Sequence, residues 1–192
     1  MNRGQIILIG GEKGGVGKST ITTNIAVEMS YRKAEVIIID TDPQKTSINW
    51  IDRRNELIEK DEPHLPKIGG VSKDGNVKDI IKDFVTKYDL VLIDASGRDS
   101  QSLRTGLTVA DKFYCPIRAS QADLETLPHI CKIIEAARDF NRNLTSKAII
   151  SCAPTNPLIN EVEDAKNLLA DFTEYLDLAK TFIRDRKVYR DA

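Results

Sequence analysis

The chain has 192 residues, of which 41% are hydrophobic and 30% are charged. This length suits one domain with its own core, and the composition excludes a disordered or low-complexity chain. The 28 basic and 29 acidic side chains leave a formal net charge of −1. Binding to DNA or to an anionic membrane would therefore need a local basic patch.

The cysteines and the apolar runs exclude two further classes of protein. Cys115, Cys131 and Cys152 form no C-x-x-C pair, which argues against a disulfide framework and favours the reducing cytoplasm. The longest strongly apolar runs, such as Ile6–Ile9 and Val36–Ile39, are much shorter than the roughly 20 residues of a membrane-spanning helix. We therefore expect a cytoplasmic protein that does not use the membrane.

Short apolar runs along the chain predict strands. Runs such as Val36–Ile39 are apolar throughout, which is typical of strands that are covered on both faces of a sheet. The predicted strands, in chain order, are Gln5–Gly10, Glu35–Asp40, Lys67–Val71, Asp89–Asp94, Lys112–Ile117, Lys147–Cys152 and Ala179–Ile183.

Between these strands, apolar residues recur at helical spacing, most clearly over residues 77–88 and 127–134. Alternating strands and helices predict right-handed crossovers and an α/β fold, a mainly parallel twisted sheet of about seven strands flanked by helices. Residues 61–76, rich in Pro and Gly, are expected to form a loop-rich excursion. No repeat or long linker divides the chain, so residues 1–192 are predicted to form a single domain.

A glycine-rich segment follows the first predicted strand and opens a helix; residues 10–20 read GGEKGGVGKST. Glycines let the backbone turn its N–H groups around an anion, and the helix N-terminus adds a positive dipole. In this P-loop pattern Lys18 is expected to reach the phosphates of a nucleoside triphosphate and Ser19 to ligate Mg²⁺. The residues expected to contact the nucleotide are Glu12, Gly14, Gly15, Val16, Gly17, Lys18, Ser19 and Thr20.

Two other predicted strands end in aspartate. Asp40 closes one of them, with Asp42 just beyond it, and Asp94 closes another. The carboxyl ends of parallel strands meet at one edge of a sheet, which is the edge where the P-loop opens. Carboxylates gathered there would repel one another, so a cation such as the Mg²⁺ that accompanies ATP is expected with them.

Glu12 stands where the general P-loop pattern has glycine, and Lys13 follows it. This loop, with the Asp40–Gln44 segment (DTDPQ) and the strand ending in Asp94, resembles the deviant Walker A ATPases of the ParA/MinD class over residues 5–192. The resemblance implies that Lys13 contacts ATP held by the other subunit of a dimer. It also implies that Asp42 activates the attacking water and that Asp40 and Asp94 support Mg²⁺, so the expected catalytic residues are Lys13, Lys18 and Asp42.

The same resemblance extends to the last third of the chain. It implies that the loop with Pro154 and Thr155 holds the adenine, although an ordinary loop would look similar. The tail from Lys180 to Asp191 carries a net positive charge, and the resemblance implies contacts to nonspecific DNA; a solvated helix face remains the alternative. The predicted DNA-binding residues are Arg184, Arg186, Lys187 and Arg190. Family members usually continue into a further helix, which this chain is expected to lack.

Together these patterns lead us to expect a ParA-type partition ATPase. The resemblance implies an ATP-dependent homodimer that binds DNA, associates with the nucleoid and is stimulated by a centromere-binding partner protein. The main alternative is a MinD-like ATPase that positions a division site or a cargo. Membrane binding of that kind needs an apolar helical face, and the tail from Thr181 is polar. A metabolic amidoligase would share the P-loop, but Lys13 and the DTDPQ segment argue against it.

Overall fold

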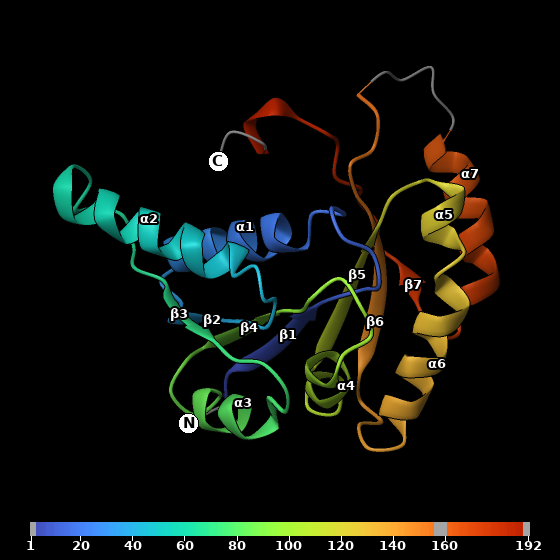
Figure 1. The fold of residues 1–192 in the computed structure, drawn as a ribbon, viewed down its shortest axis with the longest axis horizontal. Coiled ribbons are helices and arrows are strands. Elements are labelled where there is room, and N and C mark those ends of the chain that lie inside the picture. The colour runs from blue at the N-terminus through green and yellow to red at the C-terminus, as the bar shows by residue number, and fades with distance from the viewer. Residues whose placement is uncertain (1–2, 156–160, 190–192) are drawn as a thin grey trace.

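The fold is built on a seven-stranded sheet in which every strand pairs in parallel, in the order β3-β2-β4-β1-β5-β6-β7 (Figure 1). A computed structural model describes residues 3–155 and 161–189. The strands are β1 (Gln5–Ile9), β2 (Val36–Asp40), β3 (Gly69–Ser72), β4 (Leu90–Asp94), β5 (Lys112–Ile117), β6 (Thr145–Ile150) and β7 (Asp177–Leu178). The α/β class and the parallel sheet predicted from the sequence are confirmed.

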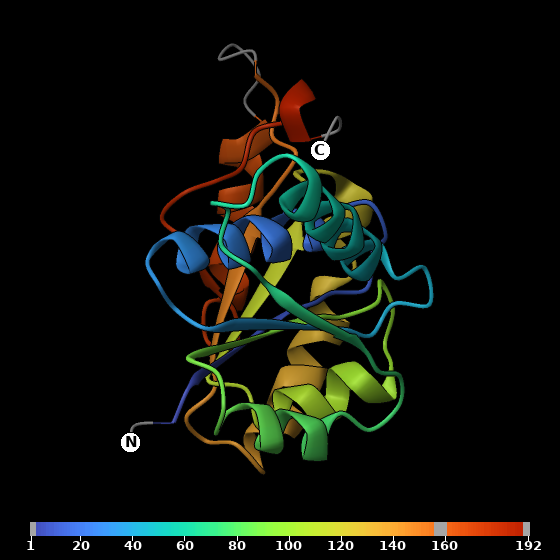
Figure 2. The same cartoon turned by 90° about the vertical axis from the view of Figure 1, so that its left-hand side faces the viewer.

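Helices cover both faces of this sheet. They are α1 (Lys18–Tyr31), α2 (Thr46–Lys60), α3 (Lys78–Phe84), α4 (Gln101–Leu107), α5 (Gln121–Leu124), α6 (Leu127–Arg138) and α7 (Glu161–Leu169), with 3₁₀ turns η1 (Ala170–Phe172) and η2 (Lys187–Tyr189). The helices α1 and α2 lie on one face, whereas α3, α4 and α6 lie on the other (Figures 1 and 2). Within the two described ranges, no helix has the length and apolar character needed to cross a membrane.

The strands are apolar throughout because their side chains alternate between two cores. Ile6 and Leu8 of β1 pack in the core under α3, α4 and α6, whereas Ile7 and Ile9 pack in the core under α1 and α2. Burial of one such side chain stabilises the folded state by roughly 1.5–3 kcal/mol. Polar groups are therefore displaced to the ends of the strands, where the loops begin.

The register of the central strands brings the P-loop and the two aspartates together. Ile9, the last residue of β1, is paired with Asp94, and Asp94 is paired in turn with Asp40 of β2. From β1 the chain crosses to β2 on one side, and from β4 it crosses to β5 on the other. This reversal makes the carboxyl edge near β1 the crevice where α/β sheets bind ligands.

The predicted seventh strand, Ala179–Ile183, is wrong in its bounds. The strand β7 ends at Leu178, and Ala179 N then donates to Ala148 O at 2.8 Å. The chain leaves the ladder after this bond and rejoins it where Ile183 N donates to Ile150 O at 2.8 Å. The tail therefore runs beside the loop that follows β6, and this course carries it to the crevice. The predicted loop-rich excursion is interrupted by β3, close to where a weak strand was expected.

Candidate functional site

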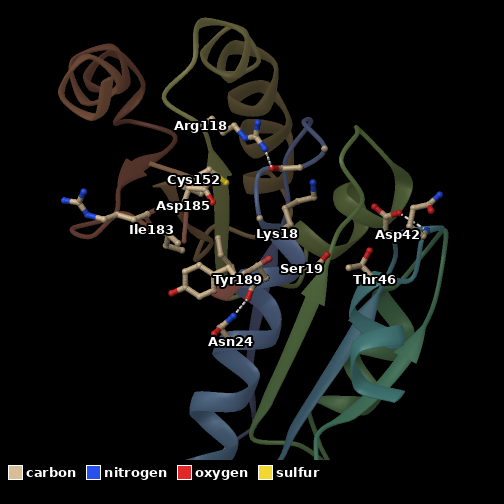
Figure 3. A pocket seen from close by; sticks show the side chains of 18 residues that line it. Lys18, Ser19, Asn24, Asp42, Thr46, Arg118, Cys152, Ile183, Asp185 and Tyr189 are labelled. Atoms are coloured by element: carbon tan, nitrogen blue, oxygen red, sulfur yellow. Dashed lines mark hydrogen bonds between the residues drawn. The ribbon is translucent and has the colours of Figure 1, made fainter. Parts of the chain in front are cut away.

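A pocket of about 760 Å³ opens at the carboxyl edge of the sheet, beside the P-loop (Figure 3). This volume suits a nucleotide-sized ligand. Its lining comes from the P-loop and α1, from the loop after β2 and the start of α2, from the segments after β5 and β6, and from the tail. The lining residues are Gly14, Gly15, Gly17, Lys18, Ser19, Thr20, Ile21, Asn24, Asp42, Gln44, Thr46, Arg118, Ser151, Cys152, Ile183, Arg184, Asp185 and Tyr189.

The P-loop backbone is shaped to receive an anion. Gly15 and Gly17 have φ angles of 70° and 82°, in the left-handed region that other residues seldom adopt. Gly17 caps α1 without a side-chain hydrogen bond, and the first turn of α1 contains no acidic residue. The first N–H groups of α1 and its positive dipole end therefore have no anionic partner from the first turn, which is the arrangement that binds phosphate.

Lys18 is a buried cation in this loop. It is 7% exposed, and its Nζ donates to the main-chain O of Lys13 at 2.7 Å. Burial lowers the pKa of Lys18, while the charges of Asp94 and Asp42 act in the opposite direction. A phosphate group would supply the full negative charge that a carbonyl oxygen lacks, so this lysine is poised for an anionic ligand.

Lys13 is half-buried, and within residues 3–155 and 161–189 its ammonium makes no hydrogen bond or ion pair. Its backbone is crowded by the segment after β4. A Cβ placed on Gly97 would lie 2.9 Å from both Lys13 O and Gly14 N, so only glycine fits there without displacing one segment. The position of the Lys13 main chain is thus tied to that of Gly97.

Glu12 and Val16, which were predicted to contact a nucleotide, do not line the pocket with their side chains. The Glu12 carboxylate is engaged by His129 of α6. Val16 is 2% exposed, and its main-chain O accepts from Ser151 Oγ at 2.8 Å. Any contact of these two residues with phosphate would therefore come from their backbone.

Asp40 caps α2 instead of facing the pocket. It is 0% exposed, and its carboxylate accepts from the N–H groups of Asp42, Ser47 and Ile48 at 2.9, 2.9 and 3.2 Å. Burial raises its pKa, with these hydrogen bonds opposing the shift. Asp40 therefore fixes the loop that carries Asp42. Its expected support of Mg²⁺ stays a prediction.

Ser19 and Asp94 bring a hydroxyl and a carboxylate together under the P-loop. Asp94 is 2% exposed and is hydrogen-bonded by Ser19 and by Ser47, whose Oγ lies 2.6 Å from Asp94 Oδ2. Burial raises the pKa of Asp94 to about 6, and the charge of Asp40 adds to this shift. A buried carboxylate beside a hydroxyl is a hard donor set that fits Mg²⁺, and the ion would neutralise phosphate charge when bound.

Asp42 lies at the mouth of the pocket, near Thr46 (Figure 3). Its Oδ1 accepts from Gln44 N at 2.9 Å, which closes an Asx turn. Its own N–H is held by Asp40. The carboxylate is therefore oriented by local hydrogen bonds while it remains half-exposed to the pocket.

The tail forms one wall of the pocket. Ala153 N donates to Ile183 O at 2.9 Å, and Asp185 N donates to Ala153 O at 2.8 Å. Arg184 donates from one guanidinium nitrogen to Pro154 O at 3.0 Å and to Thr155 O at 3.2 Å. The predicted adenine residues Pro154 and Thr155 thus do not line the pocket themselves; they are held by a tail residue that does.

The predicted DNA-binding residues separate into three groups. Arg184 belongs to the pocket wall, and its guanidinium also lies 5.2 Å from the centre of the Phe182 ring. Arg186 and Lys187 are exposed on the tail. Arg190 lies outside the described residues. Of the predicted basic residues that the structure describes, Arg186 and Lys187 are therefore the exposed ones.

Arg118, Asn24 and Tyr189 are among the pocket-lining residues that were not predicted as site residues. Arg118, after β5, donates to Gly15 O across the P-loop (Figure 3). Asn24 lies on α1 one turn beyond Thr20, whose main-chain O accepts from its amide at 2.8 Å. Tyr189 reaches the pocket from η2. Arg118 and Tyr189 arrive from distant parts of the chain, and no local pattern marks them, whereas helical spacing from Thr20 could have found Asn24.

Comparisons with known proteins agree with this geometry. A family model described as "ATPase MipZ" matches residues 5–138. The Maintenance of carboxysome distribution protein A of Halothiobacillus neapolitanus is 24% identical over 193 residues, which cover 100% of this chain and 84% of that protein.

Two solved structures share the fold. A plasmid partition protein from Borrelia burgdorferi B31 bound to AMPPNP has a TM-score of 0.73 at 20% identity, over 98% of this chain and 88% of the other. Cobyrinic acid a,c-diamide synthase from Mycobacterium smegmatis with bound ADP and magnesium has a TM-score of 0.76 at 18% identity, over 97% and 91%. At these identities the likeness shows the fold alone.

Proposed function

The chain belongs to the MipZ family of ATPases, within the ParA/MinD class, and on that basis we propose that it is a Mg²⁺-dependent ATPase for segregation or positioning. In the proposed cycle, ATP joins two copies of the chain, the dimer binds nonspecific DNA, and a partner protein stimulates hydrolysis. The ATPase class and the parallel α/β fold are established. The dimer, DNA binding, partner and dependence on Mg²⁺ form the proposal.

The main observation behind the proposal is that the ammonium of Lys18 is buried in a loop whose backbone conformation suits phosphate binding. Among the described residues, Lys18 Nζ has one hydrogen-bond partner, the Lys13 carbonyl at 2.7 Å. The N-terminus of α1 opens toward the same pocket. Both features favour a polyphosphate ligand. The AMPPNP and the ADP with magnesium in the structural relatives support ATP as that ligand.

The residues that line the pocket, and the buried Asp94 that is hydrogen-bonded to Ser19, are proposed to have separate roles in hydrolysis. Lys18 and the N–H groups of α1 would hold the phosphates, and Ser19 with Asp94 would hold Mg²⁺. Asp42 is oriented by its Asx turn and remains open to the pocket, which suits a group that orients water. These assignments place binding deep in the loop and the attack on phosphate at its mouth.

Lys13 is suited to act across a dimer interface. It is half-buried, and it has no counter-charge within the described parts of the chain. A second cation brought to the phosphates by another copy would stabilise the charge that develops on the transferred group. Dimerisation and hydrolysis would then depend on the same residue.

The tail supplies a route by which nucleotide controls DNA binding. Residues 183–185 line the nucleotide pocket, and the exposed Arg186 and Lys187 follow directly. A ligand in the pocket therefore touches the segment that carries these cations. Two tails in a dimer would double the phosphate contacts and so raise both the affinity and its salt dependence.

The cargo is proposed to be either a DNA replicon or a protein body. A centromere-binding partner would mark a replicon, as the partition protein from Borrelia burgdorferi suggests by its name. The carboxysome distribution relative, which matches 100% of this chain, favours a protein cargo as the second candidate. In either case we propose a cytoplasmic protein that associates with the nucleoid when it holds ATP.

A DNA-retention assay with a matched measurement of mass tests the cycle. The full chain is mixed with nonspecific DNA and Mg²⁺ and without nucleotide, with ADP, or with a nonhydrolysable ATP analogue. We expect retention and a doubled mass by light scattering with the analogue alone. Equal retention in all three conditions, or a monomer that turns over ATP without DNA, would instead favour a metabolic enzyme that shares the fold.

A further inference from the structure

A network of polar and ionisable side chains joins the P-loop to two helices on the other face of the sheet. His129, in the first turn of α6, donates from Nδ1 to the Glu12 carboxylate. Its Nε2 lies 3.8 Å from Asp99 Oδ2, in the segment after β4. Arg104 of α4 donates to the same carboxylate, from Nε to Asp99 Oδ1 at 2.7 Å and from Nη2 to Asp99 Oδ2 at 2.6 Å. One histidine thus stands between the P-loop and the segment after β4.

The carboxylates of this network are sheltered and ordered. The side chains of Glu12 and Asp99 are 18% and 29% exposed. The bidentate Arg104 contact lowers the pKa of Asp99, and the charge of His129 adds to this effect. Asp99 is therefore anionic and fixed in place, so it can serve as an anchor for the histidine.

The main chains of the P-loop and of the segment after β4 are also in close contact beside this network. Gly97 lies against the main chain of Lys13 and Gly14, where a Cβ would come within 2.9 Å of both. Glu12 is the neighbour of Lys13, and Asp99 is two residues from Gly97. The histidine therefore fastens the two segments where their main chains touch, and a shift of either one would move Lys13.

We propose that His129 is a positioning residue for ATP hydrolysis, which holds the Glu12 end of the P-loop against the Asp99 segment and so fixes the main chain that carries Lys13. This inference rests on the proposed function, because it assigns His129 a task in the reaction of that same site. It also explains why the loop has glutamate where the general pattern has glycine: a glycine would offer the histidine no acceptor.

The expected loss of activity on removing His129 can be compared with the expected loss of stability. Exposed ion pairs alone contribute roughly 0–1 kcal/mol to stability, so a surface contact without a positioning task would change little when removed. A displacement of a reacting group by about 1 Å can cost about 100-fold in rate. Loss of the His129 link should therefore affect turnover more than folding.

The test compares His129→Ala with His129→Asn, which keeps a donor close to the position of Nδ1, and with His64→Ala. His64 is the matched control, because it is exposed and its ion-pair partner is Glu62, away from the pocket. For ATP hydrolysis with Mg²⁺ we expect His129→Ala to lower kcat about tenfold with KM within threefold. His129→Asn should recover part of the loss, and His64→Ala should match the parent chain.

Hydrogen exchange of the nucleotide-free chain gives a second readout that does not depend on turnover. His129→Ala should speed amide exchange in residues 10–17 and 95–100 together, whereas His64→Ala should change neither. An unchanged kcat, a change in KM alone, or faster exchange in only one of the two segments would overturn the inference. If the parent chain fails to hydrolyse ATP, the proposed function fails, and the exchange experiment still decides whether His129 joins the segments.

Discussion

The Nζ of Lys18 lies 2.7 Å from the main-chain oxygen of Lys13, so one hydrogen bond joins the two lysines of the P-loop. A bound phosphate would compete with this carbonyl for the ammonium. The two lysines are therefore coupled through the backbone, although their side chains are expected to serve different copies of the protein. This separation of tasks can be tested by replacing each lysine alone.

Lys18→Ala should abolish tight ATP binding. Loss of a charged partner for the phosphates costs roughly 3 kcal/mol, or about 100-fold in Kd. Calorimetric titration with ATP and Mg²⁺ measures this change. A variant that bound ATP like the parent chain would show that the phosphates lie elsewhere.

Lys13→Ala should keep ATP affinity within about threefold, because Lys13 does not line the pocket. The same variant should lower kcat by about 100-fold or more, because a cation that stabilises the transferred phosphoryl group is lost. Steady-state turnover and light scattering in ATP measure the two effects of the variant. Normal turnover by this variant, or a normal dimer, would remove Lys13 from the interface.

Asp42→Ala should give a chain that binds ATP, dimerises and hydrolyses slowly, because the group expected to orient water is lost while the P-loop stays intact. Asp52→Ala is the control, since Asp52 is exposed on α2 and does not line the pocket. Light scattering after addition of ATP should find a long-lived dimer for Asp42→Ala. A monomer under these conditions would contradict the assignment.

Asp94→Asn should stabilise the nucleotide-free protein at neutral pH. The pKa of Asp94 in the folded chain is about 6, compared with an ordinary 3.8, so the folded state binds the proton more tightly than the unfolded state does. The free energy of unfolding therefore falls as pH rises from about 4 to about 6, by roughly 3 kcal/mol from this group.

The measurement is the difference in unfolding free energy between the parent chain and Asp94→Asn, by urea titration at pH 4 and pH 7. The variant should gain most at pH 7 and little at pH 4. Stabilisation by ATP with Mg²⁺ should be weaker in the variant. An equal difference at both pH values would show that burial of the Asp94 charge is not the cause.

Arg186→Glu with Lys187→Glu should remove ATP-dependent DNA retention and leave basal ATP turnover intact. Each lost phosphate contact should make the negative slope of log K against log salt concentration shallower by about 0.9. The control is Lys78→Glu with Lys82→Glu, on α3 at the opposite face of the sheet. Unchanged retention by the tail variant would place the DNA surface elsewhere.

The parts of the site that sequence reasoning found are the local ones. Lys18, Ser19 and Asp94 lie in segments whose chemistry is written in consecutive residues, and strand order brings them to one edge of the sheet. The role of Asp40 was harder to predict, because an aspartate at the end of a strand can cap a helix or face a ligand. The backbone donors Ser47 N and Ile48 N, in the first turn of α2, show that Asp40 caps the helix.

The parts that were missed depend on contacts between distant segments. His129 meets Glu12 across 117 positions of sequence, and Arg118 meets Gly15 across 103. The return of the tail to Ile150 depends on where β7 ends, and a two-residue strand leaves almost no pattern. Such contacts follow from packing and topology, which a pattern of residue types specifies only in outline.

The return of the tail to the pocket has a practical consequence for fusion proteins. Tyr189 lines the pocket beside the P-loop, whereas β1 begins at the opposite end of the sheet. A fluorescent or affinity tag inserted directly after Tyr189 would lie beside the pocket and would disturb nucleotide exchange. A tag placed ahead of β1 would leave the mouth of the pocket unobstructed.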